Sequence, residues 1–130
     1  MKKFAFLAIT MTLAACSIPS DINNHQAFFE LNSAEISRDA RRELKSQAEY
    51  LKRNPETKIV IQGHCDERGS TEYNLALGAL RAGNAAHAII HEGIEPNRIR
   101  TVSYGKNKPS HFGTGEKIWS KNRNTTTIVE

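Results

Sequence analysis

Residues 58–81, KIVIQGHCDERGSTEYNLALGALR, contain a strand pattern, a polar loop and a helix pattern in that order. The three consecutive β-branched residues at 59–61 are typical of a strand that is buried on both faces. A loop at 63–69 follows, and Ser70 is suited to cap a helix that continues to about Glu92. Because a strand followed at once by an amphipathic helix must bury its apolar face, this stretch predicts a sheet with a helix packed on it.

The sequence on either side of this stretch supplies one more helix and three more strands. Ser37 is suited to cap a helix to about Arg53, because alanine and leucine recur there at helical spacing. Strands are expected at 27–31, 100–104 and 125–129, and 106–122 is expected to be mostly loop. The order strand, helix, strand, helix, strand, strand predicts an α/β fold of the α+β type, with one mixed sheet and both helices packed on it. The strand–helix–strand units favour parallel pairing, whereas the last strand is expected to enter antiparallel or at an edge.

The composition indicates one small globular domain. A chain of 130 residues, 38% of them hydrophobic and 25% charged, is long enough for one core but not for two. The formal charge of +4 includes Lys2 and Lys3; without them, 16 of the 18 basic residues stand against 14 acidic ones. Nucleic-acid-binding proteins usually show clustered lysine and arginine instead. We therefore expect no nucleic-acid partner.

The N-terminal residues have the pattern of an export signal. Lys2 and Lys3 precede an apolar run at 4–13, which is shorter than the roughly 20 residues of a membrane-spanning helix. The run ends in Leu-Ala-Ala-Cys, which resembles the lipobox of bacterial lipoproteins; an ordinary secretory signal with a chance cysteine is the alternative. The resemblance implies cleavage before Cys16 and a lipid anchor on that residue. We expect a signal peptide at 1–15, a lipidated tether at 16–26 and the folded domain at 27–130.

The loop at 63–69 and the helix after it carry residues that could bind a ligand. Four residues share one helix face because three, four and seven positions separate them: Asn74, Leu77, Gly78 and Arg81. Arg81 keeps its charge and offers a planar fork of donors that suits a carboxylate. If the loop folds over this face, Asp66 and Arg81 form a pair of opposite charges that can bind a zwitterion, with Gly78 leaving room for it. A structural salt bridge between the same two residues is the alternative.

The residues of this region resemble a known family. Gly-His-Cys-Asp-Glu-Arg-Gly-Ser at 63–70, Glu-Tyr-Asn at 72–74 and Leu-Gly at 77–78 are similar to the central motif of the OmpA-like peptidoglycan-binding domain. The similarity extends from Phe28 to Val129, and the Asp-Glu-Arg-Gly form is most similar to the branch of peptidoglycan-associated lipoproteins. The resemblance implies a non-catalytic domain that binds peptidoglycan and uses no cofactor.

The resemblance also implies roles for individual residues. The family aspartate that matches Asp66 accepts the ammonium of meso-diaminopimelate in the peptide stem, and the arginine that matches Arg81 binds its carboxylate. Asn74 and Leu77 match positions that line the same groove, and Arg123 is expected to brace the fold. The implied location is the outer membrane, where the lipid anchor is held. The implied partners besides peptidoglycan are TolB and other Tol proteins.

Several positions depart from the family pattern. Leu31-Asn32 stands where these lipoproteins have Phe-Asp, and Leu80 and Asn124 each replace an arginine, so those family roles are not transferred. Weaker binding, or a divergent lipoprotein of another envelope system, is therefore an alternative. A periplasmic wall hydrolase or metal enzyme is the alternative of a different class. Cys65 is the only cysteine besides Cys16, so no disulfide is expected within the domain, and the scattered histidines predict no metal site.

Overall fold

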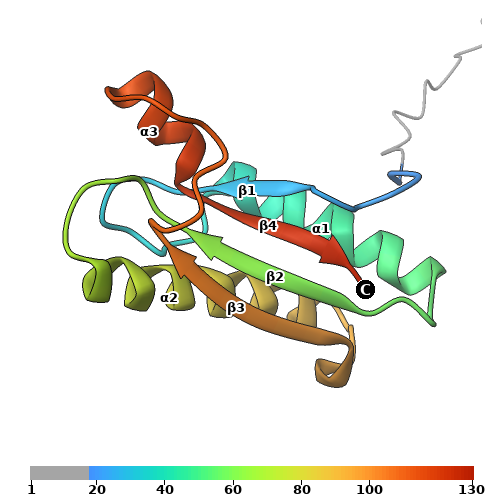
Figure 1. Ribbon diagram of the computed structural model, residues 1–130. Coiled ribbons are helices and arrows are strands. Elements are labelled where there is room, and N and C mark those ends of the chain that lie inside the picture. Colours follow the sequence, from blue (N-terminus) through green and yellow to red (C-terminus); the bar gives the residue numbers. More distant parts are fainter. Residues whose placement is uncertain (1–17) are drawn as a thin grey trace, which may run out of the picture.

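The computed structural model describes residues 18–130, which form a four-stranded mixed sheet with two long helices on one face (Figure 1). The expected signal peptide at 1–15 and Cys16 lie outside the described residues. The elements are β1 (Gln26–Phe28), α1 (Arg38–Arg53), β2 (Ile59–His64), α2 (Thr71–His91), the 3₁₀ turn η1 (Pro96–Arg98), β3 (Ile99–Gly105), α3 (Glu116–Asn122) and β4 (Asn124–Val129). The expected α+β class, with helices packed on one mixed sheet, is confirmed. Over the described range, no helix combines the length and apolar character needed to cross a bilayer.

The strands lie in the order β1-β4-β2-β3. β2 and β3 pair in parallel, as expected for strands that a helix connects. β4 is antiparallel to both of its neighbours, which confirms its expected direction. It lies inside the sheet rather than at an edge. Its buried Thr125 and Thr127 lie on the helix side, where the Thr127 hydroxyl donates to Gln47 of α1.

The core lies between the sheet and the inner faces of α1 and α2. Leu44 and Leu51 of α1, Ile61 of β2 and Ile89 of α2 are each no more than 1% exposed. Burying one such side chain contributes roughly 1.5–3 kcal/mol. The helical spacing of alanine and leucine that predicted α1 therefore marks the side of this helix that faces the core.

Both expected helix starts are confirmed. Ser37 Oγ accepts the Ala40 N–H at 3.1 Å, and Ser70 Oγ accepts the Tyr73 N–H at 3.1 Å. Each bond satisfies one of the four N–H groups that a helix start leaves without an intrahelical acceptor. Ser70 thereby fixes the residue at which the loop after β2 gives way to α2.

The folded domain begins earlier than expected. Ile22 is completely buried in the core, and the Asn24 N–H donates to Thr127 O at 2.7 Å. The last part of the expected tether, 16–26, therefore packs on the domain, and β1 itself starts at Gln26. A single isoleucine in a polar segment has no periodicity, so sequence patterning could not indicate its burial.

The segment at 106–122 was expected to be mostly loop, and that expectation is wrong because it contains α3. No side chain caps this short helix. Two contacts stabilise it: Glu116 pairs with Arg123, the residue just after the helix, and Trp119 Nε1 donates to the distant Glu67 Oε1 at 2.9 Å. Because these partners lie outside the helix, its own residues carry little sign of it.

β2 continues to His64, two residues beyond the expected strand, where it packs closely on α2. A Cβ atom on Gly63 would lie 1.8 Å from the Gly78 carbonyl oxygen, and one on Gly78 would lie 2.3 Å from Ser103 Oγ. Only a pair of glycines permits this approach of strand and helix. The expectation that Gly78 leaves room for a ligand is therefore wrong, because β2 and β3 fill that space.

Candidate ligand-binding site

Of the predicted site residues, Asp66 lies in the loop between β2 and α2, and the other three lie on α2. Figure 1 shows this loop at one end of the sheet. All four are buried, with exposed fractions between 0% and 8%: Asp66, Asn74, Leu77 and Arg81. Hydrogen bonds and ion pairs bring the turn after β1 and the start of β4 to the same place. No three metal-type side chains within residues 18–130 gather into a group that could hold an ion.

The carboxylate of Asp66 is paired with two arginines. Arg68 Nε donates to Oδ1 at 3.2 Å, Arg68 Nη2 donates to Oδ2 at 2.8 Å, and Arg123 Nη1 lies 3.5 Å from Oδ2. Burial alone favours the neutral carboxyl, but the hydrogen bonds from Arg68 and Arg123 outweigh it and hold the pKa of Asp66 below its usual value. Asp66 is therefore an anion at neutral pH in a position to accept a cation.

Arg81 is fully buried and bonds to the backbone instead of to an acid. Its Nε donates to Ser33 O at 2.8 Å, its Nη1 to His64 O at 2.9 Å and its Nη2 to Glu30 O at 2.9 Å. No carboxylate in the described part of the chain lies within 4.0 Å, so the structural salt bridge with Asp66, which was the alternative to a ligand site, does not form. Burial lowers the pKa of Arg81, although an arginine stays charged. The guanidinium is a buried cation whose direct polar partners are three backbone carbonyls, and the Phe29 ring lies 5.3 Å from its carbon.

The turn at 30–33 covers the guanidinium of Arg81. β1 ends at Phe28, earlier than expected, and the chain then bends so that two carbonyls of the turn accept from Arg81. Asn32 has φ of 54°, and its Oδ1 accepts the Tyr73 hydroxyl at 3.3 Å, which links the turn to α2. Arg81 is 0% exposed, because this turn and the end of β2 together cover its guanidinium.

Asn74 and Leu77 support the loop from α2. Asn74 Nδ2 donates to Arg68 O at 2.7 Å and to Ser70 O at 3.0 Å, so it holds the loop against the first turn of the helix. Leu77 lies about one turn further along and is 8% exposed. Cys65 is buried beside them, its thiol donates to Asn74 O at 3.3 Å, and burial raises its pKa. This thiol is therefore a packing group.

Sequence reasoning missed the part that Arg68 and Trp119 play. The Arg68 guanidinium carbon lies 4.0 Å from the centroid of the Trp119 ring, a cation–π contact. The same indole donates to Glu67, the residue next to Arg68. The spacing of Asp66 and Arg68 was the only local signal, because Trp119 comes from α3, which the sequence did not indicate.

Arg123 braces the site, as expected. Its Nε donates to Phe29 O at 2.9 Å, and its terminal nitrogens pair with Glu116 and approach Asp66. It thereby connects the end of β1, the start of α3 and the loop after β2. The arrangement holds the Asp66 carboxylate in one place.

A family model described as the OmpA family matches residues 28–124. The chain belongs to the OmpA family. Curated relatives named peptidoglycan-associated lipoprotein include one from Brucella suis, 43% identical over 102 residues, and one from Rhizobium meliloti, 44% identical over 102 residues. Both matches cover 78% of this chain but only 61% and 58% of the relatives, so this OmpA-family chain spans about three fifths of their length.

Solved structures agree with the family assignment. The peptidoglycan-associated lipoprotein from Burkholderia pseudomallei is 36% identical, with a TM-score of 0.78 over 81% of this chain and 89% of that one. The C-terminal domain of Helicobacter pylori MotB has a TM-score of 0.75 over 81% of this chain and 83% of that one, but at 21% identity it shares the fold alone. The resemblance that the motifs indicated is thus confirmed, and membership of the OmpA family agrees with a non-catalytic domain.

Proposed function

We propose that this chain is a lipoprotein of the bacterial outer membrane that binds the peptide stems of peptidoglycan without chemical change. The relatives that match most of its folded part are named peptidoglycan-associated lipoproteins. Leu-Ala-Ala-Cys at 13–16 offers a point of lipid attachment, and Ser17, where an inner-membrane signal would usually have aspartate, favours the outer membrane. The lipid anchors the chain in the outer membrane and the folded domain binds the peptidoglycan, so the chain links the membrane to the wall.

The buried charge of Arg81 is the observation that carries this proposal. Taking a charge out of water is costly, so buried cations usually have an acid partner. Arg81 has none within 4.0 Å in the described residues, and its three carbonyl bonds use three of the five N–H donors of a guanidinium. A ligand carboxylate that enters beneath the turn at 30–33 supplies the missing negative charge.

Asp66 supplies the opposite charge for the same ligand. No ion pair within 4.0 Å joins Asp66 to Arg81 in the described residues. We propose that one zwitterion contacts both, and meso-diaminopimelate offers an ammonium to Asp66 and a carboxylate to Arg81. On binding, the ammonium takes the place of Arg68, which keeps its contact with Trp119.

A purely structural role of Arg81 is the competing explanation, since its bonds fix the turn at 30–33 on α2. Asp66 separates the two explanations better because its polar contacts are with Arg68 and Arg123 rather than with the turn at 30–33. We expect Asp66→Asn to weaken co-sedimentation of the full chain with purified cell-wall sacculi by at least about tenfold, because a charge-assisted contact to a ligand is worth roughly 2–5 kcal/mol.

The matched control is Asp39→Asn, the same change at a carboxylate that is 92% exposed on α1. It should leave co-sedimentation unchanged, and circular dichroism should show both variants folded at the assay temperature. Normal binding by folded Asp66→Asn would mean that Asp66 and its arginines are only structural. Released muropeptides would mean that the chain is a wall hydrolase.

We also propose Tol proteins, chiefly TolB, as partners in the envelope. The resemblance of the Asp-Glu-Arg-Gly loop at 66–69 to the peptidoglycan-associated lipoproteins supports this proposal. Purification of the tagged full chain from envelope extract should recover TolB. Recovery of a different set of envelope proteins would instead favour a divergent lipoprotein of another system.

A further inference from the structure

β1 is an edge strand whose outer backbone groups have no strand partner in the described residues. β4 lies on one side of it and no strand lies on the other. The Thr127 N–H donates to His25 O, and the Phe29 N–H donates to the carbonyl just before β4, each at 2.9 Å. In an antiparallel pair, every second residue bonds to the partner strand, and the residues that alternate with these direct their N–H and C=O away from it. The backbone groups of Gln26 and Phe28 therefore point out of the sheet.

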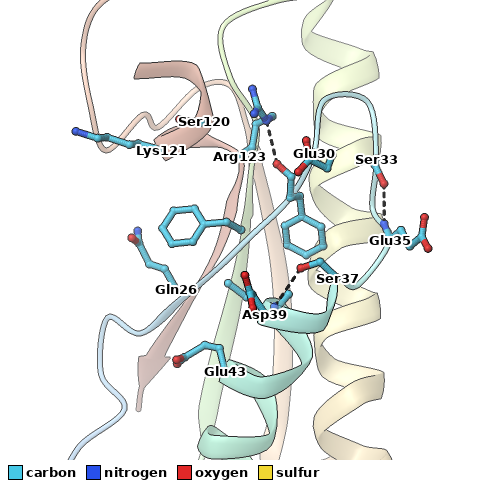
Figure 2. A pocket seen from close by; sticks show the side chains of 14 residues that line it. Gln26, Glu30, Ser33, Glu35, Ser37, Asp39, Glu43, Ser120, Lys121 and Arg123 are labelled. Carbon is cyan, nitrogen blue, oxygen red and sulfur yellow. Dashed lines mark hydrogen bonds between the residues drawn. The ribbon is translucent and has the colours of Figure 1, made fainter. Parts of the chain in front are cut away.

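A groove of about 790 Å³ runs along this edge, between the first turn of α1 and the end of α3 (Figure 2). Gln26 and Phe28 line it from β1, Asp39 and Glu43 line it from α1, and Lys121 lines it from α3. Phe28 is 48% exposed, so an apolar surface accompanies the outward backbone groups. The groove thus offers hydrogen-bonding groups and apolar contact along one line.

Carboxylates dominate the charge of this groove. Four of them line it: Glu30, Glu35, Asp39 and Glu43. In the part of the chain that the structure describes, neither Glu30 nor Glu35 has a cation within 4.0 Å, and the one cation near Asp39 is an exposed arginine 3.9 Å away. The partners of the Glu43 carboxylate are a histidine at 2.8 Å and the neutral amide of Gln47 at 3.0 Å. These acids therefore have little internal compensation.

Two cations also line the groove, and only one of them is available. Arg123 is buried and committed to Glu116 and to a backbone carbonyl. Lys121 is exposed, and Figure 2 shows it at the opposite end of the groove from Asp39 and Glu43. The side of the groove along α1 is thus negative.

We propose that an extended, basic segment of another polypeptide binds along β1 as an added strand. Its backbone pairs with the outward groups of Gln26 and Phe28, as in other cases of strand addition to a sheet edge. Its lysine or arginine side chains on one face meet the carboxylates of α1, and charge complementarity of this kind speeds association and sets specificity. A helical partner cannot use the outward backbone groups, and a polyanion is repelled. The surface uses none of Asp66, Asn74, Leu77 and Arg81, although Glu30 and Ser33 of the turn over Arg81 also line the groove.

A nitrogen-15-labelled full chain in detergent, titrated with the capped peptide Lys-Thr-Lys-Val-Lys-Thr-Lys, tests this proposal. We expect the largest amide shifts at Gln26 and Phe28, with little change along β3, the other edge of the sheet. Two further peptides are N-methylated: the first at the backbone amides of its lysines, and the second at the backbone amides of the intervening residues. Because an added strand needs one of these sets for its hydrogen bonds, at least one methylated peptide should lose binding.

Charge variants complete the test. Glu35→Gln together with Asp39→Asn should weaken binding about fivefold, since exposed ion pairs are individually weak. Lys121→Gln removes a charge of opposite sign from the same groove and should bind at least as tightly as the unchanged chain. The proposal is overturned if the peptide does not bind at millimolar concentration, if both methylated peptides bind as tightly as the unmethylated one, or if the shifts lie along β3.

Discussion

Arg68 contacts both oxygens of the Asp66 carboxylate, with Nε 3.2 Å from Oδ1 and Nη2 2.8 Å from Oδ2. The Asp66 side chain is 5% exposed and that of Arg68 is 34% exposed, so the arginine covers the acid from the solvent side. An internal cation therefore holds the position that we assign to the ammonium of a ligand. Binding of that ligand is a competition with Arg68.

Arg68→Gln should strengthen binding to the diaminopimelate stem about fivefold, because it removes the competing cation from a partly exposed ion pair. Calorimetric titration measures the affinity directly. Arg42→Gln, at an arginine whose side chain is 76% exposed on α1, is the matched control and should have no effect. Weaker binding by Arg68→Gln would show that Arg68 itself contacts the ligand.

The stability of the fold should depend on Asp66 at acid pH. The pKa of Asp66 is lower in the folded chain than in the unfolded one, where an aspartate titrates near about 4. Its ionised form therefore stabilises the fold above that pH, and this contribution is lost as the pH falls through the folded pKa. Melting temperatures between about pH 5 and pH 2.5 should fall less steeply for Asp66→Asn than for the unchanged chain. Equal slopes would show that the arginine contacts of Asp66 contribute nothing to stability.

The glycine pair between β2 and α2 gives a test of the fold itself. Gly63→Ala should destabilise the chain by more than about 2 kcal/mol, because the added Cβ meets the Gly78 carbonyl oxygen at 1.8 Å and backbone must shift. Gly83→Ala is the matched control within α2: its Cβ would meet nothing within 4 Å. Since alanine suits a helix better than glycine, it should stabilise by about 0.5–1 kcal/mol. Chemical denaturation of both variants measures these free energies, and similar losses in both would contradict the packing described.

Local sequence patterns predicted the elements whose stabilising contacts are local. The caps at Ser37 and Ser70 and the buried strand at 59–61 each follow from neighbouring residues, and all three are confirmed. α3 escaped prediction because Glu116 and Trp119 take their partners from outside the helix. The burial of a single residue upstream of β1 left no pattern for the same reason.

The candidate site was predicted in position but not in its pairings. The sequence placed Asp66 in the loop after a strand and Arg81 on the face of the next helix, and brought the two together only if the loop folds over that face. It could not show that Arg68 would bind the acid, or that the turn at 30–33 would supply carbonyls to Arg81. Nor could it show that Gly78 meets β2, since the register of a helix on a sheet is a tertiary property.

The lipid anchor is tested by Cys16→Ala. The apolar run followed by Leu-Ala-Ala-Cys predicts that the variant is exported but carries no lipid. Labelling with palmitate and phase partitioning in detergent distinguish the two forms: the unchanged chain should enter the detergent phase and the variant should not. Unaltered labelling and membrane retention of Cys16→Ala would rule out this cysteine as the anchor.

The central claim is that Asp66 and Arg81 together recognise a zwitterion of the wall, and the choice between two stem peptides tests it most directly. Calorimetric titration of the full chain in detergent compares a stem that contains meso-diaminopimelate with one that contains lysine in its place. Lysine keeps an ammonium for Asp66 but has no second carboxylate, so the charge of Arg81 stays uncompensated. We predict that the lysine stem binds at least about tenfold more weakly. Equal affinity for the two stems would contradict the claim.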